Sequence, residues 1–110
     1  MEIVAKKNHK DALIKLSGRL DMNTAPDLRN AALALYAKGG RKNLTLDFTE
    51  VSFIDTSGLA TLLEILVVAK EQHAQLILSG LNEKVQYLID VNGLKGFFRI
   101  GSPAPERLNP

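Results

Sequence analysis

Strand-like and helix-like segments alternate along most of this chain, and that order constrains its fold more than any other feature. Three apolar stretches, at residues 44–48, 76–78 and 97–100, have the length and composition of β-strands. Longer stretches with helical spacing of Leu, Ala, Val and Ile separate them. Strands joined by such crossovers pair in parallel through right-handed connections. The sequence therefore predicts an α/β fold, with a single β-sheet packed by helices.

A β-hairpin is expected at the start of the chain. Residues 3–5 and 12–16 alternate between apolar and polar side chains, and the polar residues 8–11 between them favour a turn. Strands joined by so short a turn are antiparallel, so the sheet should be mixed. Gly18 is expected to end the second strand and to open a loop over residues 18–21. The full predicted order is β-β-α-β-α-β-α-β.

Helix boundaries are marked by capping residues. Thr24 is a candidate N-cap, with Pro26 in the first turn and Asp27 placed either to close a capping box or to interact favourably with the helix dipole. Residues 39–40 are both glycine and should end this first helix.

The strand at residues 44–48 should lead through a short connection at residues 51–54 to a second helix that ends near Gln72. Asn82 is expected to cap a third helix, which the Asn-Gly pair at residues 92–93 terminates. We predict one domain over residues 1–110, with a loosely ordered, proline-containing tail from residue 103 to the end.

Composition excludes several classes of function. Lys and Arg total 14 against 12 for Asp and Glu, so the net charge of +2 is too small to favour nucleic-acid binding. The absence of cysteine excludes disulfides, thiolate metal sites and thiol nucleophiles, and no other pattern implies a metal or a cofactor. No apolar run approaches the roughly 20 residues of a membrane span, and the first residues do not resemble a signal peptide. We therefore expect a cytoplasmic protein that does not insert into membranes.

Residues 55–58, Asp-Thr-Ser-Gly, stand where a buried strand gives way to the second helix. A helix N-terminus has unpaired N–H groups and a partial positive charge, so a phosphate on Ser57 could be received there. Gly58 should remove side-chain bulk beside the Ser57 hydroxyl and admit a kinase. The simpler interpretation, left open by the residues alone, is that Ser57 or Thr56 only caps the helix.

Three segments, in order, resemble a known family. Asp55-Thr56-Ser57-Gly58-Leu59 resembles the signature of anti-sigma factor antagonists of the STAS type, the Gly-Arg-Leu-Asp at residues 18–21 resembles that family's first loop, and residues 91–98 are similar to its usual ending. The resemblance implies phosphorylation of Ser57 by a partner anti-sigma factor serine kinase, with Thr56 as a minor alternative site. It also implies that a serine phosphatase resets the switch.

The same resemblance implies that Asp21 and Asp55 lie close to Ser57, and that Asp21, Asp55, Thr56, Ser57 and Gly58 form the partner-binding surface. Binding would release a sigma factor, and phosphorylation would switch binding off. Two carboxylates could orient the hydroxyl by accepting its hydrogen bond and would repel an added phosphate. The alternatives are that Asp55 is only a helix-entry residue, and that Asp21 only caps its loop. Asp47 is expected to make a structural hydrogen bond.

Other functions fit less well. A serine nucleophile needs a base, and the two histidines fall in the predicted hairpin turn (His9) and near the far end of the second helix (His73), so we do not expect an enzyme. The same domain type also serves as a subunit of bacterial lipid-transport ABC complexes, which is the main alternative. It also builds stress-signalling scaffolds, but those usually need an extra N-terminal sensor domain.

Overall fold

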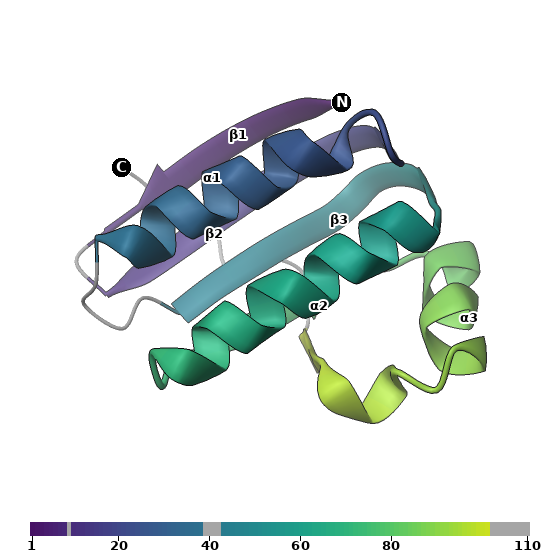
Figure 1. The fold of residues 1–110 in the computed structure, drawn as a ribbon. Helices are drawn as coiled ribbons and strands as arrows, with labels where there is room; N and C mark the ends of the chain where they lie inside the picture. The colour runs from purple at the N-terminus through teal and green to yellow at the C-terminus, as the bar shows by residue number, and fades with distance from the viewer. Residues whose placement is uncertain (9, 39–42, 102–110) are drawn as a thin grey trace.

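The computed structural model describes residues 1–8, 10–38 and 43–101, which form one five-stranded sheet with helices packed on it (Figure 1). The strand order is β1-β2-β3-β4-β5; β1 and β2 are antiparallel and the other neighbours are parallel. This confirms the predicted α/β fold and mixed sheet. The elements are β1 (Glu2–Lys7), β2 (Asp11–Leu20), α1 (Ala25–Ala37), β3 (Asn43–Ile54), α2 (Thr56–Glu71), β4 (Leu76–Ser79), α3 (Glu83–Val91), the 3-10 turn η1 (Lys95–Phe97) and β5 (Arg99–Gly101).

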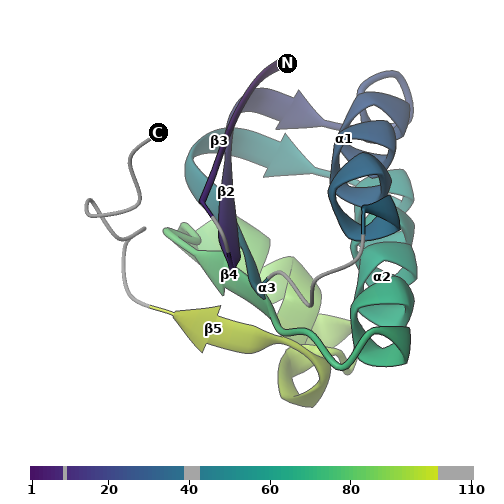
Figure 2. The same cartoon turned by 90° about the vertical axis from the view of Figure 1, so that its left-hand side faces the viewer.

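The core lies between the sheet and the pair α1 and α2, which run side by side over one face of the sheet (Figures 1 and 2). Ile14, Leu46 and Leu78 are neighbours on three adjacent strands, and all three are fully buried. Leu28 of α1 and Leu62 of α2 are also fully buried in this cluster. The buried side chains of the strands and those of the two helices therefore pack in one core. This packing fixes the position of the ends of β2 and β3 relative to α1 and α2.

Two strands are longer than predicted. β3 continues to Ile54 instead of ending in a connection after residue 48, and β2 continues through Gly18 to Leu20. The two strands pair along this extension, with register shifts between Lys15 and Ser17 and again between Gly18 and Arg19. Gly18 has a φ of +97° inside β2 and does not end the strand. At the register shift beside it, Gly18 pairs with Val51 and Arg19 with Phe53, so the extra residue of the bulge is Ser52 of β3.

The predicted helix starts are partly confirmed. Asn82 caps α3, since its side chain accepts a hydrogen bond from Val85 N at 2.8 Å. Thr24 stands at the N-cap position of α1, but its side chain makes no capping bond. The Thr24 hydroxyl instead donates to Arg19 O at 2.7 Å and accepts from Asp21 N at 2.9 Å, so the predicted capping box is wrong.

The helix ends and the last strand need smaller corrections. α2 ends at Glu71, one residue before the predicted position, and α3 ends just before Asn92, as predicted. The last strand is confined to Arg99–Gly101, because Phe97 belongs to the preceding 3-10 turn. The glycines at residues 39–40, His9 and the predicted tail at residues 103–110 lie outside the described residues.

Candidate functional site

Two strand-to-helix junctions meet at one end of the sheet (Figure 1). Leu20, the last residue of β2, is the register partner of Ile54, the last residue of β3. The backbone of Asp55 continues this pairing, since its N–H donates to Leu20 O at 3.1 Å. The loop that begins with Asp21 therefore lies against the start of α2. Asp21, Asp55 and Ser57, which the sequence analysis expected to lie close together, all belong to this junction. In parallel sheets, functional residues commonly lie at the carboxyl ends of the strands.

Asp55 is the N-cap of α2 and ties the two junctions together. Its Oδ1 accepts a hydrogen bond from Gly58 N at 3.0 Å, and its Oδ2 accepts one from Met22 N at 3.2 Å. The first bond satisfies a free donor of the helix, and the second holds the Asp21 loop against it. The carboxylate of Asp55 is thus engaged with backbone N–H groups and does not accept a hydrogen bond from the Ser57 hydroxyl.

Asp21 organises its own loop. Its Oδ1 accepts from Asn23 N at 3.0 Å and from Thr24 N at 3.3 Å, and its Oδ2 lies 3.5 Å from Arg19 Nε. Burial acts to raise the pKa of the Asp21 carboxyl, but hydrogen bonds from the Asn23 N–H, from the Thr24 hydroxyl and N–H, and from Arg19 together lower it below its ordinary value. Asp21 therefore remains a carboxylate at neutral pH and adds a fixed negative charge beside the start of α2.

Ser57 stands in the first turn of α2 and is half-buried, whereas its neighbour Thr56 is exposed. Since Asp55 is the cap, neither hydroxyl has that role, and the simpler interpretation of Ser57 or Thr56 as an N-cap is wrong. Within the described residues the Ser57 hydroxyl has no hydrogen-bond partner. It therefore lies at the positive end of a helix and takes no part in the hydrogen bonds that hold the junction.

Gly58 is needed for internal packing. It is buried, and a Cβ at this position would lie 2.6 Å from Ile54 Cγ1 and 2.8 Å from Leu20 O. The start of α2 can approach the end of β2 this closely only when residue 58 has no side chain. The expectation that Gly58 clears space for a kinase is thus replaced by a different role, because the chain's own residues fill that space.

Arg19 and Phe53 extend the site beyond the residues predicted from the sequence. The guanidinium carbon of Arg19 lies 4.1 Å from the centre of the Phe53 ring, an arrangement typical of a cation–π contact, and the same guanidinium pairs with Asp21. The sequence analysis missed Phe53, because it took 51–54 as a connection, and it named Arg19 only as part of the loop at residues 18–21. The feature of the sequence that could have indicated Phe53 is an aromatic residue at an exposed position of a strand.

An apolar groove of about 430 Å³ opens beside Phe53, between the end of β3 and α3. Tyr87, on the α3 side of the groove, is 64% exposed. The groove lies next to the junction, because Phe53 lines the groove and also contacts Arg19, the partner of Asp21. The lining residues are Ser52, Phe53, Ile54, Glu83, Lys84, Val85, Tyr87 and Leu88.

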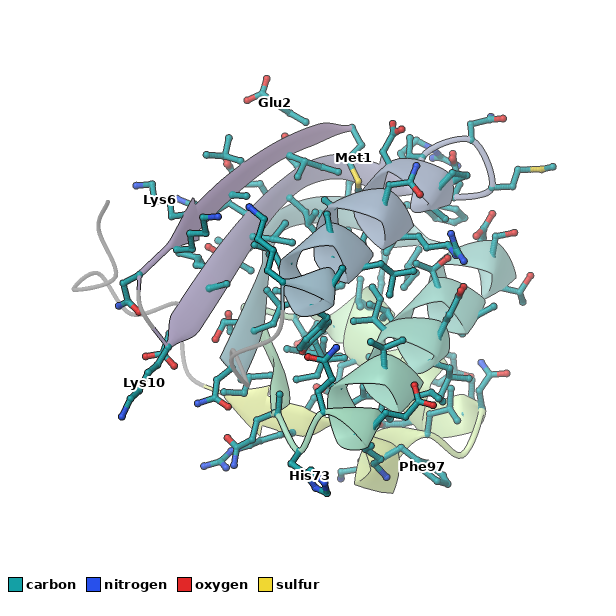
Figure 3. All side chains as sticks on the ribbon, turned by 60° about the vertical axis from the view of Figure 1, so that its left-hand side comes forward. Met1, Glu2, Lys6, Lys10, His73 and Phe97 are labelled. Carbon is teal, nitrogen blue, oxygen red and sulfur yellow. The ribbon has the colours of Figure 1, made fainter. Side chains whose placement is uncertain are left out.

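The remaining predicted residues lie elsewhere. Asp47 makes the structural hydrogen bonds expected of it, since its carboxylate accepts from the N–H and the hydroxyl of Thr49. His73 is exposed in the turn that follows α2, at the opposite end of that helix from Ser57 (Figure 3). Across residues 1–8, 10–38 and 43–101, no cluster of three or more potential metal ligands is present. In the same part of the chain, no helix is long and apolar enough to cross a membrane.

Comparison with known proteins gives a consistent result. The anti-sigma-B factor antagonist of Bacillus subtilis is 28% identical over 102 residues, which cover 93% of this chain and 92% of that protein. An anti-sigma factor antagonist from Mycobacterium paratuberculosis has a similar structure, with a TM-score of 0.81 at 21% identity, covering 97% of this chain and 89% of that one. The phosphorylated form of the Bacillus cell fate determinant SpoIIAA matches with a TM-score of 0.76 at 19% identity, covering 96% and 94%.

The sequence model of the STAS domain matches residues 2–104, which is nearly the whole chain. Fold, junction and relatives agree with that match. This chain belongs to the STAS domain family, and its near-full-length relatives are named anti-sigma factor antagonists.

Proposed function

We propose that this protein is an anti-sigma factor antagonist whose binding to its partner is controlled by phosphorylation of Ser57. The observation that carries the proposal is the Ser57 hydroxyl itself. Ser57 is half-buried, and its hydroxyl is not used in capping α2. It lies at a junction held by hydrogen bonds from backbone N–H groups to Asp21 and Asp55 and by the contact between Arg19 and Phe53. A protein of the same fold occurs in a phosphorylated form, which supports a reversible modification on this scaffold.

In the unphosphorylated state, the surface formed by Asp21, Asp55, Thr56 and Ser57 binds an anti-sigma factor that is also a serine kinase. When it is bound to this protein, the kinase releases its sigma factor. The kinase transfers the terminal phosphoryl group of ATP to Ser57 Oγ: a new P–O bond forms at Oγ, the bond between the γ-phosphorus and the β,γ-bridging oxygen breaks, and ADP leaves. The proton of the hydroxyl passes to a base of the kinase. The protein binds no metal or cofactor of its own in this scheme, and the ATP belongs to the kinase. A serine phosphatase restores the hydroxyl, and all of these steps take place in the cytoplasm.

Phosphorylation switches binding off through charge. It adds about −1.5 to −2 charges at pH 7. The N-terminus of α2 tolerates an anion, so the fold itself should be retained. The carboxylates of Asp21 and Asp55 already place negative charge at this junction, and an unpaired charge buried in an interface weakens binding by about 3 kcal/mol or more. The phosphate therefore leaves the protein folded but prevents its binding to the anti-sigma factor.

Intact-mass analysis tests the acceptor. The protein is incubated with ATP and candidate anti-sigma factor kinases, and wild type is compared with Ser57→Ala and Thr56→Ala. We expect one phosphate on wild type and on Thr56→Ala, and none on Ser57→Ala. A phosphate that persists on Ser57→Ala would move the acceptor to another residue. No phosphate with any such kinase, together with stable binding to a transporter ATPase, would replace the switch with the lipid-transport function.

A further inference from the structure

Strand β1 forms an outer edge of the sheet, and among the described residues it has a neighbouring strand on one side only. An edge strand presents a row of backbone N–H and C=O groups that can pair with another strand. Its six residues are Glu-Ile-Val-Ala-Lys-Lys, and Val4 near its centre is 43% exposed. Ile3 packs against the core, so Glu2, Val4 and Lys6 lie on the opposite face of the sheet.

The charges on this face are complementary to those of a second copy of the same strand. When two β1 strands pair antiparallel with Val4 opposite Val4, Glu2 of each copy lies opposite Lys6 of the other. Residues directly opposite each other share a face, so the two-fold axis generates two Glu2–Lys6 pairs around a Val4–Val4 contact. Within the described residues neither Glu2 nor Lys6 has an ion-pair partner. Figure 3 shows both side chains on the outer strand.

The same charges oppose other ways of pairing. Parallel, in-register association would place Lys6 beside Lys6 and Glu2 beside Glu2, and like charges directly opposite each other are destabilising. Lysines on edge strands commonly serve to prevent such open-ended association. In the antiparallel arrangement, however, the lysine meets a glutamate, and the two-fold axis closes the assembly at two copies.

We infer that the β1 edge is a dimerisation surface, on which a second copy of this chain pairs antiparallel to give one continuous ten-stranded sheet (two copies of the five-stranded sheet). A single short strand from each copy buries less area than a standard interface, so the dimer is weak and dissociates in the micromolar to millimolar range. This surface is independent of Ser57, and its test does not depend on the proposed function.

Sedimentation equilibrium over about 10 µM to 1 mM at low ionic strength tests the inference by charge reversal. We expect wild type to dimerise and the single variants Glu2→Lys and Lys6→Glu each to weaken the dimer about tenfold, because two attractive pairs become repulsive. The double variant should restore the affinity, because each pair is then formed in reverse. Circular dichroism confirms that the variants are folded.

Two further variants address the contact on the axis. Val4→Glu should abolish the dimer, whereas Val67→Glu, at an exposed valine on α2, should leave it unchanged. Wild type that remains monomeric up to 1 mM would overturn the inference. So would a double charge reversal that fails to recover the affinity, or a Val67→Glu variant that weakens the dimer as much as Val4→Glu.

Discussion

At the residue scale, Gly58 and Asp55 determine how the start of α2 is held. Asp55 is fixed by two backbone N–H donors from different segments, and Gly58 permits the contact between α2 and the end of β2. Ser57 lies between them and is spared from both tasks. The contacts that hold the start of α2 thus do not use the Ser57 hydroxyl, so the phosphorylation proposed above should leave them in place.

Replacement of Gly58 by alanine should therefore cost stability. The new Cβ would overlap Ile54, and Leu20 beside it, where neither the backbone nor the packed side chain can easily move. We expect a loss of about 1–3 kcal/mol in the free energy of unfolding, measured by urea denaturation. Gly96→Ala is the matched control, since a Cβ at Gly96 meets nothing within 4 Å. Equal stability of the two variants would show that position 58 has room for a side chain.

The buried hydroxyl of Tyr36 should make the folding stability of the protein depend on pH in the alkaline range. Burial raises the pKa of its hydroxyl from 10.0 to about 12. The unfolded chain then loses this proton first, so the stability that Tyr36 contributes is fully present below pH 10 and is lost as pH rises toward 12. In the variant Tyr36→Phe, stability should fall less steeply between pH 10 and pH 12. Thermal melting at a series of pH values measures this. Tyr87→Phe, at an exposed tyrosine, should leave the loss unchanged, and a flattened profile there would contradict the assignment.

At the scale of elements, the fold was more predictable than the site. The helices α2 and α3 and the cap at Asn82 follow from local sequence, and the structure confirms them. The length of β3 could not be read locally, because bulges in its pairing with β2 displace the alternation and leave Ser52 and Phe53 both exposed. Pairing over a long sequence separation decides such extensions, and a single sequence does not display it.

The site was predicted in its residues but not in its bonding. The resemblance to a family indicated Asp21 and Asp55 beside Ser57, and physical reasoning left open whether the two carboxylates orient the serine hydroxyl or only cap the helix and the loop. The structure gives both to backbone N–H groups. An aspartate before a helix and an aspartate in a tight loop satisfy nearby donors first, since unpaired backbone groups are costly.

Asp55 should accordingly act as a structural joint between elements. Asp55→Ala removes the cap of α2 and the bond to the Met22 N–H, so we expect a loss of about 1–2 kcal/mol in the free energy of unfolding. Asp27→Ala, at an exposed carboxylate in the first turn of α1, should cost only a few tenths of a kcal/mol. A loss at Asp55 no larger than that at Asp27 would show that the joint contributes little.

At the scale of the whole molecule, the residues that stabilise the fold and the residue proposed to be phosphorylated are in different places. The core lies between the sheet and the helices α1 and α2, whereas Ser57 stands at the start of α2 and Phe53 lines the apolar groove between β3 and α3. A phosphate at Ser57 is a change of surface charge at the end of a helix. Binding should respond strongly to it, while the packing of the core stays the same.

The central claim is tested most directly by the affinity of the partner for the two states of the protein. Unphosphorylated protein and protein carrying a single phosphate on Ser57 are titrated against the same anti-sigma factor kinase, with a nonhydrolysable ATP analogue present. We predict that the phosphate weakens binding at least about 100-fold, with Ser57→Ala close to the unphosphorylated protein. Equal affinity of the two states would contradict the account.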